Sequence, residues 1–293
     1  MKPTTTFAKQ WLQLPRNGFF FKLIDHGVAP DIINDISACL NEFFDLPMEL
    51  KLKGARTGGL TLGYSASNLD YGHNLPWAEI LQFMQLPEQI AEFSKRDYGN
   101  EQHQVLSNAM IRYMKALEKL GTTILEMRAQ GLGLESDIFT RHFKDKETTT
   151  MIRTNRYTPC PLLERCLGLG SHSDPHTLMI LLQDQGGGLQ VRDDEGRWLG
   201  IHPIPNSFIV IPILLLLGMD KWKAKECCPQ SSCKQGKECL SVAYFISPTV
   251  TLVIESPPEL MDSGPNPRKY APFTWGEFRK ELLKQKSSRE NST

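Results

Sequence analysis

Several features that would place this 293-residue chain at a membrane or on nucleic acid are missing. Lys plus Arg and Asp plus Glu number 33 each, so the charge balance predicts neither a nucleic-acid partner nor a membrane-surface partner. The longest apolar run, Phe208 to Met219, is interrupted by Pro212 and Gly218. It is also shorter than the roughly 20 residues that cross a bilayer.

Two further absences bear on the compartment. The N-terminal stretch MKPTTTFAKQWLQLP has no apolar core of the kind found in signal peptides. The seven cysteines are an odd number without paired spacing. We therefore expect a reduced, cytoplasmic chain rather than a disulfide scaffold.

The first half of the chain is patterned mainly as helix. Pro30 suits the first turn of a helix that ends before Pro47, and apolar residues at helical spacing predict a long helix over 101–130. Ser136 can cap a short helix that reaches Phe143. The Gly- and Ser-rich segment 51–72 is expected to be a loop.

From Met151 onward the pattern changes to short strands separated by turn signals. We expect strands at 151–157, 176–183, 188–193, 197–202, 207–217 and 240–247, and an amphipathic helix at 273–283. Many short strands around a small polar site favour a jelly roll.

The centre of this half is His172-Ser173-Asp174. Residues two apart in an extended segment point to the same side, so the imidazole and the carboxylate would face one point. These are two of the three ligands of the 2-His-1-carboxylate triad that holds non-haem Fe(II). Alone, His-x-Asp is a weak signal that also suits a polar turn.

The surrounding motifs strengthen the signal. Asn155-Arg-Tyr-Thr-Pro-Cys-Pro161, Gly168-Leu-Gly-Ser-His-Ser-Asp-Pro175, Leu181-Leu-Gln-Asp184 and Gly187-Gly-Leu-Gln-Val191 follow in order. The series resembles the plant 2-oxoglutarate- and Fe(II)-dependent dioxygenases, which include gibberellin oxidases and flavonoid oxygenases. The likeness extends from about Gly18 to about Lys284.

The resemblance implies an α+β fold with a double-stranded β-helix, or jelly-roll, core flanked by helices. Residues 1–145 would form a helical region with the first jelly-roll strand, truncated relative to the family. Residues 150–250 would form the dioxygenase core, and 251–293 a helix with a polar tail. A cupin-like binding module is the weaker alternative.

The resemblance also implies an enzyme with a small-molecule substrate. Such an oxidoreductase would bind Fe(II), use 2-oxoglutarate and O2, and take ascorbate as an accessory reductant. The substrate would be a plant hormone or secondary metabolite, with a gibberellin favoured and auxins or flavonoids open. A monomer is expected.

Site residues follow from the same likeness. His172 and Asp174 would bind the metal, and Asn155, Tyr157 and Ser241 would contact 2-oxoglutarate. Asn155 and Tyr157 fall on one face of a predicted strand, although an ordinary buried pair would show the same pattern.

Two elements that the family carries are not intact. No histidine follows His202, although the family has a second metal histidine further along the chain. The Arg-x-Ser pair that would grip the far carboxylate of 2-oxoglutarate reads Cys239-Leu-Ser241. His176 would be a poor geometric substitute for the missing histidine. A catalytically impaired family member is therefore the alternative.

Both losses fall in 211–239, which resembles nothing in the family. Read one base later, plausible codons for 227–230 can encode Val-Val-His-Arg, with the histidine at the codon of Pro229. We hypothesise that this interval is translated in a shifted frame. The rival interpretation is a zinc site formed by Cys227, Cys228, Cys233 and Cys239, although their spacing lacks paired C-x-x-C knuckles.

Overall fold

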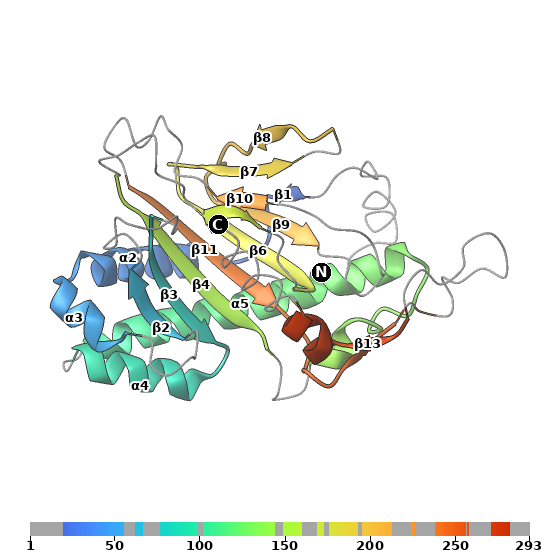
Figure 1. The fold of residues 1–293 in the computed structure, drawn as a ribbon, viewed down its shortest axis with the longest axis horizontal. Coiled ribbons are helices and arrows are strands. Elements are labelled where there is room, and N and C mark those ends of the chain that lie inside the picture. Colours follow the sequence, from blue (N-terminus) through green and yellow to red (C-terminus); the bar gives the residue numbers. More distant parts are fainter. Residues whose placement is uncertain are drawn as a thin grey trace.

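A large antiparallel sheet organises the computed structural model, which describes residues 20–55, 62–66, 77–98, 102–143, 149–159, 169–172, 176–192, 195–212, 224–226, 238–255, 257 and 271–281. Its seven strands lie in the order β1-β9-β6-β11-β4-β3-β2 (Figure 1). Their bounds are Phe21–Leu23, Phe208–Pro212, Leu178–Gln183, Cys239–Ile246, Met151–Tyr157, Glu79–Met84 and Gly63–Ala66 in that order.

A smaller sheet completes the double layer. Its order is β5-β10-β7-β8, with bounds Leu169–His172, Ala224–Glu226, Leu189–Arg192 and Trp198–Gly200. A third, two-stranded sheet joins β12 (Val253–Ile254) to β13 (Phe273–Thr274). Two antiparallel sheets packed face to face, with strands far apart in sequence as neighbours, agree with the predicted jelly roll.

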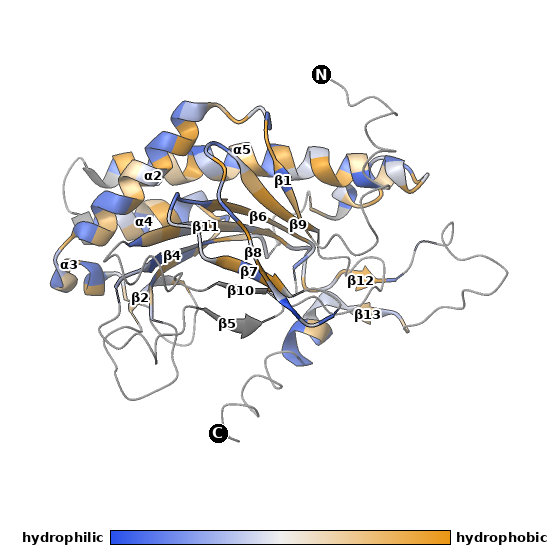
Figure 2. Ribbon diagram, turned by 90° about the horizontal axis from the view of Figure 1, so that it is seen from above, coloured by the Kyte–Doolittle hydropathy of each residue, from blue (hydrophilic) through white to orange (hydrophobic). Residues whose placement is uncertain are grey.

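The helices cover the other face of the large sheet (Figure 2). They are α2 (Pro30–Asp45), α3 (Met48–Lys53), α4 (Pro87–Tyr98) and α5 (Gln102–Gly131). The approach of α5 is close, because a β-carbon on Gly121 would lie 2.1 Å from Cδ1 of Ile246 on β11. Among the helices of the described ranges, none is both long and apolar enough to cross a bilayer.

Successive residues along the strands of the large sheet face two different apolar cores in turn. On β11, Leu240, Val242, Tyr244 and Ile246 join the core beneath the helices. Ala243 and Phe245 instead join the core shared with Leu189 and Val191 of the small sheet. This alternation is the period of two expected for an extended chain with both faces buried. It defines an inner face, toward the small sheet, on which Ser241 and Cys239 also lie.

Several expectations about local structure are confirmed. Strand β4 occupies the predicted 151–157, α2 ends before Pro47, and α5 occupies the predicted 101–130 within one residue at each end. The shift to strands after Met151 also holds, because β4, β6, β7, β8 and β9 lie within expected segments and β11 is offset by one residue, whereas β5 and β10 were not among the expected strands.

Other expectations were wrong. Segment 51–72 is not one loop, because Lys51 belongs to α3 and residues 63–66 form β2, which pairs with β3. Turns with a 3-10 segment, Thr140–Phe143, replace the short helix predicted after Ser136. By contrast, the helix expected at 273–283 is confirmed over residues 275–281, whereas residues 273–274 form β13. The buried Trp275 donates from Nε1 to Oγ1 of Thr149 at 2.9 Å.

Candidate active site on the inner face of the large sheet

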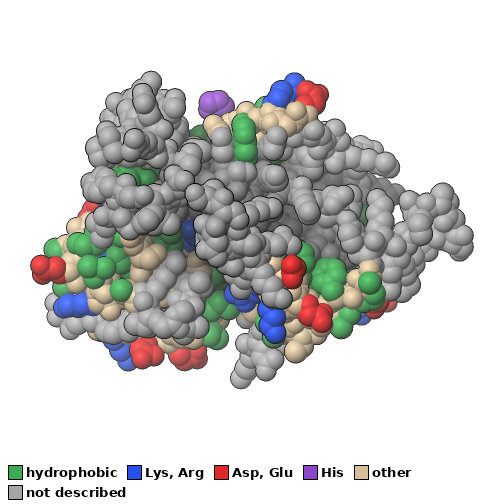
Figure 3. All heavy atoms as spheres, in the orientation of Figure 1, with side chains coloured by type: hydrophobic (Ala, Val, Ile, Leu, Met, Phe, Trp, Pro, Cys, Tyr) green, Lys and Arg blue, Asp and Glu red, His purple; other side chains and the backbone are tan. Residues whose placement is uncertain are grey.

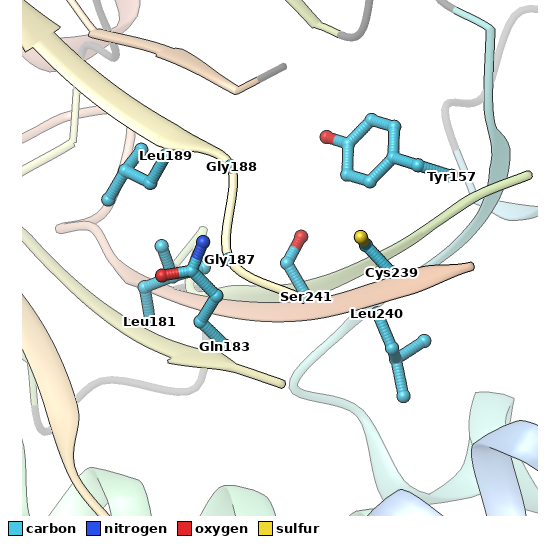
Figure 4. A pocket seen from close by; sticks show the side chains of 9 residues that line it. All are labelled: Tyr157, Leu181, Gln183, Gly187, Gly188, Leu189, Cys239, Leu240 and Ser241. Atoms are coloured by element: carbon cyan, nitrogen blue, oxygen red, sulfur yellow. The ribbon is translucent and has the colours of Figure 1, made fainter. Parts of the chain in front are cut away.

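The strands β4 and β11 bring three of the predicted site residues together. Their antiparallel register places Ser241 opposite Asn155 and Cys239 opposite Tyr157. All four side chains belong to the inner face, because they alternate with outward-facing neighbours. In Figure 4, Ser241 and Cys239 point to the same side of β11, toward Tyr157, while Leu240 points away.

A small pocket opens at this point between the two sheets. Its lining comes from the ends of β4, β6 and β11 and from the turn that leads into β7: Tyr157, Leu181, Gln183, Gly187, Gly188, Leu189, Cys239, Leu240 and Ser241. Hydroxyl, amide and thiol groups line it beside apolar side chains. This composition suits a small ligand that carries polar groups.

A hydrogen-bonded chain runs along β4 beside the pocket. Asn155 donates from Nδ2 to Oγ of Ser241 at 3.3 Å, and Arg153 donates from Nε to Oδ1 of Asn155 at 2.9 Å. Asn155 and Ser241 are 2% and 5% exposed. Because buried polar groups need partners, this chain fixes the orientation of both side chains.

The turn after β6 closes one end of the pocket. Asp184 accepts hydrogen bonds from the backbone amides of Gly186 at 2.8 Å and Leu240 at 2.6 Å, so it ties this turn to the start of β11. Burial raises the pKa of Asp184, and the hydrogen bonds from the amides act in the opposite direction. Gly187 and Gly188 have φ of 70° and 110°, values that other residues rarely adopt.

Gln183 adds an acceptor that the sequence did not reveal as a site residue. It lies on β6 directly opposite Ser241, so that Asn155, Ser241 and Gln183 form one row across three strands. Its Oε1 is buried and has no hydrogen-bond partner among the described residues. An unsatisfied buried acceptor is costly, so this atom suits a donor supplied by a ligand.

The metal residues predicted from the sequence are described only in part. His172 ends β5, and its backbone pairs with Ala224 of β10, while its side chain and all of Asp174 lie outside the described residues. Ala224 offers no side-chain donor to a metal. Within the described ranges, no three His, Cys, Asp or Glu side chains gather closely enough to hold a metal ion.

Two other predicted metal ligands are placed by the structure. His176 lies near the opposite end of β11, where Nδ1 and Oγ of Ser247 are 2.6 Å apart and the imidazole stacks against Phe245. It is therefore engaged away from the pocket. Of the cysteines in the rival zinc site, Cys239 lines the pocket, and Cys227, Cys228 and Cys233 lie outside the described residues.

Arg156 links the end of β4 to helix α2 and to the residue before β11. It lies on the outer face of β4, between Asn155 and Tyr157. It donates to Asp45, the last residue of α2, at 2.6 Å and to Glu238, which precedes β11, at 2.8 Å. The pairing holds the ends of β4 and β11 in register where the pocket forms.

Sequence comparisons agree with this architecture. The 2OG-Fe(II) oxygenase superfamily matches residues 148–248, and the family described as non-haem dioxygenase in morphine synthesis N-terminal matches residues 14–104. Gibberellin 20 oxidase 1-B of Triticum aestivum is 31% identical over 264 residues, which cover 89% of this chain and 71% of that protein. The chain therefore belongs to the 2OG-Fe(II) oxygenase superfamily and is a 2-oxoglutarate-dependent dioxygenase by family.

Solved structures show the same fold. The crystal structure of JOX2 in complex with 2OG, Fe and JA is 28% identical, with a TM-score of 0.79 over 94% of this chain and 80% of that chain. A dioxygenase for auxin oxidation in rice has a TM-score of 0.77 at 22% identity, over 96% of this chain and 90% of that chain. The predicted α+β jelly-roll class is confirmed.

The pocket fits the co-substrate of this family only in part. 2-Oxoglutarate is a dianion, and Tyr157, Ser241 and Gln183 can form hydrogen bonds with one of its ends. At the start of β11, however, the pocket is lined by the neutral Cys239, which is 2% exposed and packs with Ala78, Ile80 and Tyr157. A buried carboxylate needs a compensating charge, and this position does not supply one.

Proposed function

We propose that this chain is an Fe(II)- and 2-oxoglutarate-dependent dioxygenase that oxidises a small plant hormone or secondary metabolite, with a gibberellin favoured. The observation that carries the proposal is the meeting of Tyr157 and Ser241 at one pocket, from strands distant in sequence, with Asn155 hydrogen-bonded to Ser241 beside it. The gibberellin 20 oxidases among its relatives support the substrate class.

In this proposal, His172 and Asp174 would hold the iron, which would supply oxygen activation coupled to decarboxylation of 2-oxoglutarate. Tyr157 and Ser241 orient the co-substrate by hydrogen bonds, and Asn155 holds Ser241 in place at 3.3 Å. The hydrogen bond of Asp184 to the amide of Leu240 holds the turn after β6 against β11 at that end of the pocket. Ascorbate as accessory reductant, a monomeric state and a cytoplasmic location belong to the same proposal.

The test compares two serines at opposite ends of β11. Ser241→Ala removes a pocket hydroxyl, whereas Ser247→Ala removes a hydroxyl that contacts His176. Formation of succinate from 2-oxoglutarate is measured with Fe(II), ascorbate and a panel of gibberellins.

We expect Ser241→Ala to raise the KM for 2-oxoglutarate about tenfold or more, the value of one hydrogen bond to a charged group. Ser247→Ala should leave that KM unchanged. Equal KM values for both variants would refute the assignment of Ser241.

A second candidate is a family member that is catalytically impaired. The neutral Cys239 in the pocket and the absence of any histidine after His202 favour it. Binding of Fe(II) by the purified chain under anaerobic conditions, with 2-oxoglutarate present, separates the candidates, because loss of a ligand weakens the metal site. Tight uptake of Fe(II) argues for the enzyme, and weak uptake for the impaired member.

The transcript across 206–247 shows whether the impairment is natural. A shifted frame with a histidine near 229 and an arginine near 239 means that the natural protein carries the missing residues. Confirmation of the residues as written means that the site lacks them in the cell.

A further inference from the structure

Strand β6 separates from β11 beside the pocket. The last pair in their register is Gln183 opposite Ser241. One residue further on, the amide of Asp184 still donates to the carbonyl oxygen of Leu240 at 3.1 Å. An antiparallel ladder would return a second hydrogen bond, from the amide of Leu240 to the carbonyl oxygen of Asp184. That oxygen instead accepts from the amide of Gly187 at 3.3 Å, so the amide of Leu240 needs another acceptor.

The side chain of Asp184 is that acceptor. Its Oδ2 accepts from the amide of Leu240 at 2.6 Å, and its Oδ1 accepts from the amide of Gly186 at 2.8 Å. Hydrogen bonds from backbone amides to a carboxylate are roughly twice as strong as those between neutral groups. The carboxylate thus replaces the missing bond of the ladder and connects the turn after β6 to the start of β11.

Asp184 differs in this respect from carboxylates on the surface. Acidic and basic side chains are interspersed over the described part of the face in Figure 3, where water is an alternative partner for each of them. Asp184 is partly buried, and both of its oxygens bind backbone amides. Its loss would leave these amides without their acceptor, and an unsatisfied buried amide is costly.

Pocket residues flank both of the anchored amides. In Figure 4, the side chain of Leu240 points away from the pocket, whereas its neighbours Cys239 and Ser241 line it. On the other side of the carboxylate, the turn continues into Gly187 and Gly188, which also line the pocket. A displacement of either amide would therefore move a wall of the pocket.

The turn gains little rigidity from its own residues. It contains three consecutive glycines, Gly186 to Gly188, and glycine has more conformational freedom than any other residue. The turn is nevertheless packed closely against β11, because a β-carbon on Gly186 would lie 2.5 Å from Sγ of Cys239 and 2.9 Å from Oδ1 of Asp184. The order of this turn must come from contacts outside it, and Asp184 supplies two of them.

We propose that Asp184 is a positioning residue, whose carboxylate holds the glycine turn against the segment from Cys239 to Ser241, so that the pocket is already formed before a ligand binds. Asp184 does not itself line the pocket, and it acts through the backbone of the residues that do. A preformed site avoids the cost of ordering its walls when the ligand arrives. The inference rests on the proposed function for the identity of the ligand, 2-oxoglutarate.

The first test measures local opening through two thiols of the same chain. Cys239 lines the pocket, whereas Cys39 lies on α2 in the core beneath the helices. The proteins are the unaltered chain, Asp184→Asn, Asp184→Glu and the control Asp35→Asn, whose carboxylate pairs with Arg112 on the helical surface. Labelling of each thiol by a small alkylating reagent is followed by mass spectrometry of the peptide that contains it.

Asparagine has the shape of aspartate but one accepting oxygen, so Asp184→Asn loses one of the two amide hydrogen bonds. Labelling of Cys239 should become about tenfold faster or more, whereas labelling of Cys39 should stay within about twofold of its rate in the unaltered chain. In Asp35→Asn, both rates should stay within that range. An unchanged rate at Cys239 in Asp184→Asn overturns the proposal. Equal acceleration of both thiols also overturns it, because this result reports global unfolding.

Folding of each variant is checked by circular dichroism. If Asp184→Asn does not fold, Asp184→Glu decides, because glutamate keeps the charge but is longer by one methylene and cannot meet both amides without moving the turn. Labelling of Cys239 should then again be faster than in the unaltered chain. A rate equal to that of the unaltered chain would overturn the proposal.

The second test measures binding of 2-oxoglutarate by isothermal titration calorimetry under anaerobic conditions with Fe(II). A pocket that must form on binding costs affinity, so Asp184→Asn should bind about tenfold more weakly, and Asp35→Asn should match the unaltered chain. Equal affinity of Asp184→Asn and the unaltered chain overturns this inference alone. An unaltered chain that binds no 2-oxoglutarate defeats the proposed function alone, and the labelling of Cys239 then decides whether Asp184 holds the pocket in place.

Discussion

A buried ion pair between α3 and β3 provides a test of how the helices are attached to the large sheet. Lys51 of α3 donates from Nζ to Oε2 of Glu79 at 2.5 Å and to the backbone oxygen of Phe44 at 2.8 Å. The same Glu79 oxygen accepts from the hydroxyl of Tyr64 on β2 at 2.5 Å. Lys51 and Glu79 are 4% and 5% exposed, so water cannot replace a lost partner.

The perturbation is Glu79→Gln, which keeps the shape and an acceptor for Tyr64 but leaves the Lys51 ammonium buried without a counter-charge. Removal of one partner of a buried pair costs about 3–5 kcal/mol. Since a domain is stable by roughly 5–15 kcal/mol, this variant should lose a large part of its free energy of unfolding. The double variant Lys51→Met with Glu79→Gln contains no buried charge at this place and should recover most of the loss.

The assay is equilibrium unfolding in urea, followed by tryptophan fluorescence and circular dichroism, for the unaltered chain, both single variants and the double variant. We expect a coupling free energy of about 2 kcal/mol or more between the two sites. Additive single effects, with a coupling below about 0.5 kcal/mol, would refute the view that the pair acts as one buried unit.

Two further variants test local packing and pH dependence. A valine at Gly121 should lower the free energy of unfolding by about 1–3 kcal/mol, because its β-carbon would overlap Ile246, whereas Gly200→Val in open space should stay within about 0.5 kcal/mol in urea unfolding. Burial lowers the pKa of His26, whose Nδ1 accepts from the amide of Val28 at 3.1 Å, so the folded state favours the neutral ring. The contribution of His26 to stability is therefore present above a pH of about 6.5 and lost as the pH falls below it, and His26→Gln should flatten that decline; an unchanged pH profile of unfolding would contradict this assignment.

The local sequence pattern was sufficient to predict structure wherever the residues of one segment determine its conformation. Alternation along 151–157 placed Asn155 and Tyr157 on one face, and α5 followed from apolar residues at helical spacing. Both patterns arise from backbone geometry that neighbouring residues determine. Arg153, which donates a hydrogen bond to Asn155, lies on the same face for the same reason.

Segments that are stabilised by residues distant in sequence were harder to predict. The short strand β2 lies in a Gly- and Ser-rich region and exists through its pairing with β3, while α3 carries a lysine whose burial depends on Glu79. The residues of β2 and of α3 do not by themselves indicate the partner that stabilises each of them.

The sequence by itself indicated the family, most of the strands after Met151 and the types of residue available for chemistry. Only the tertiary structure decided which of these residues meet, because Asn155 and Ser241 are 86 residues apart and come together through a register set by long-range hydrogen bonds. The same register placed Gln183 beside them and Cys239 opposite Tyr157. A shift of one residue would turn each of these side chains to the other face, so the pocket is a property of the paired strands rather than of any one segment.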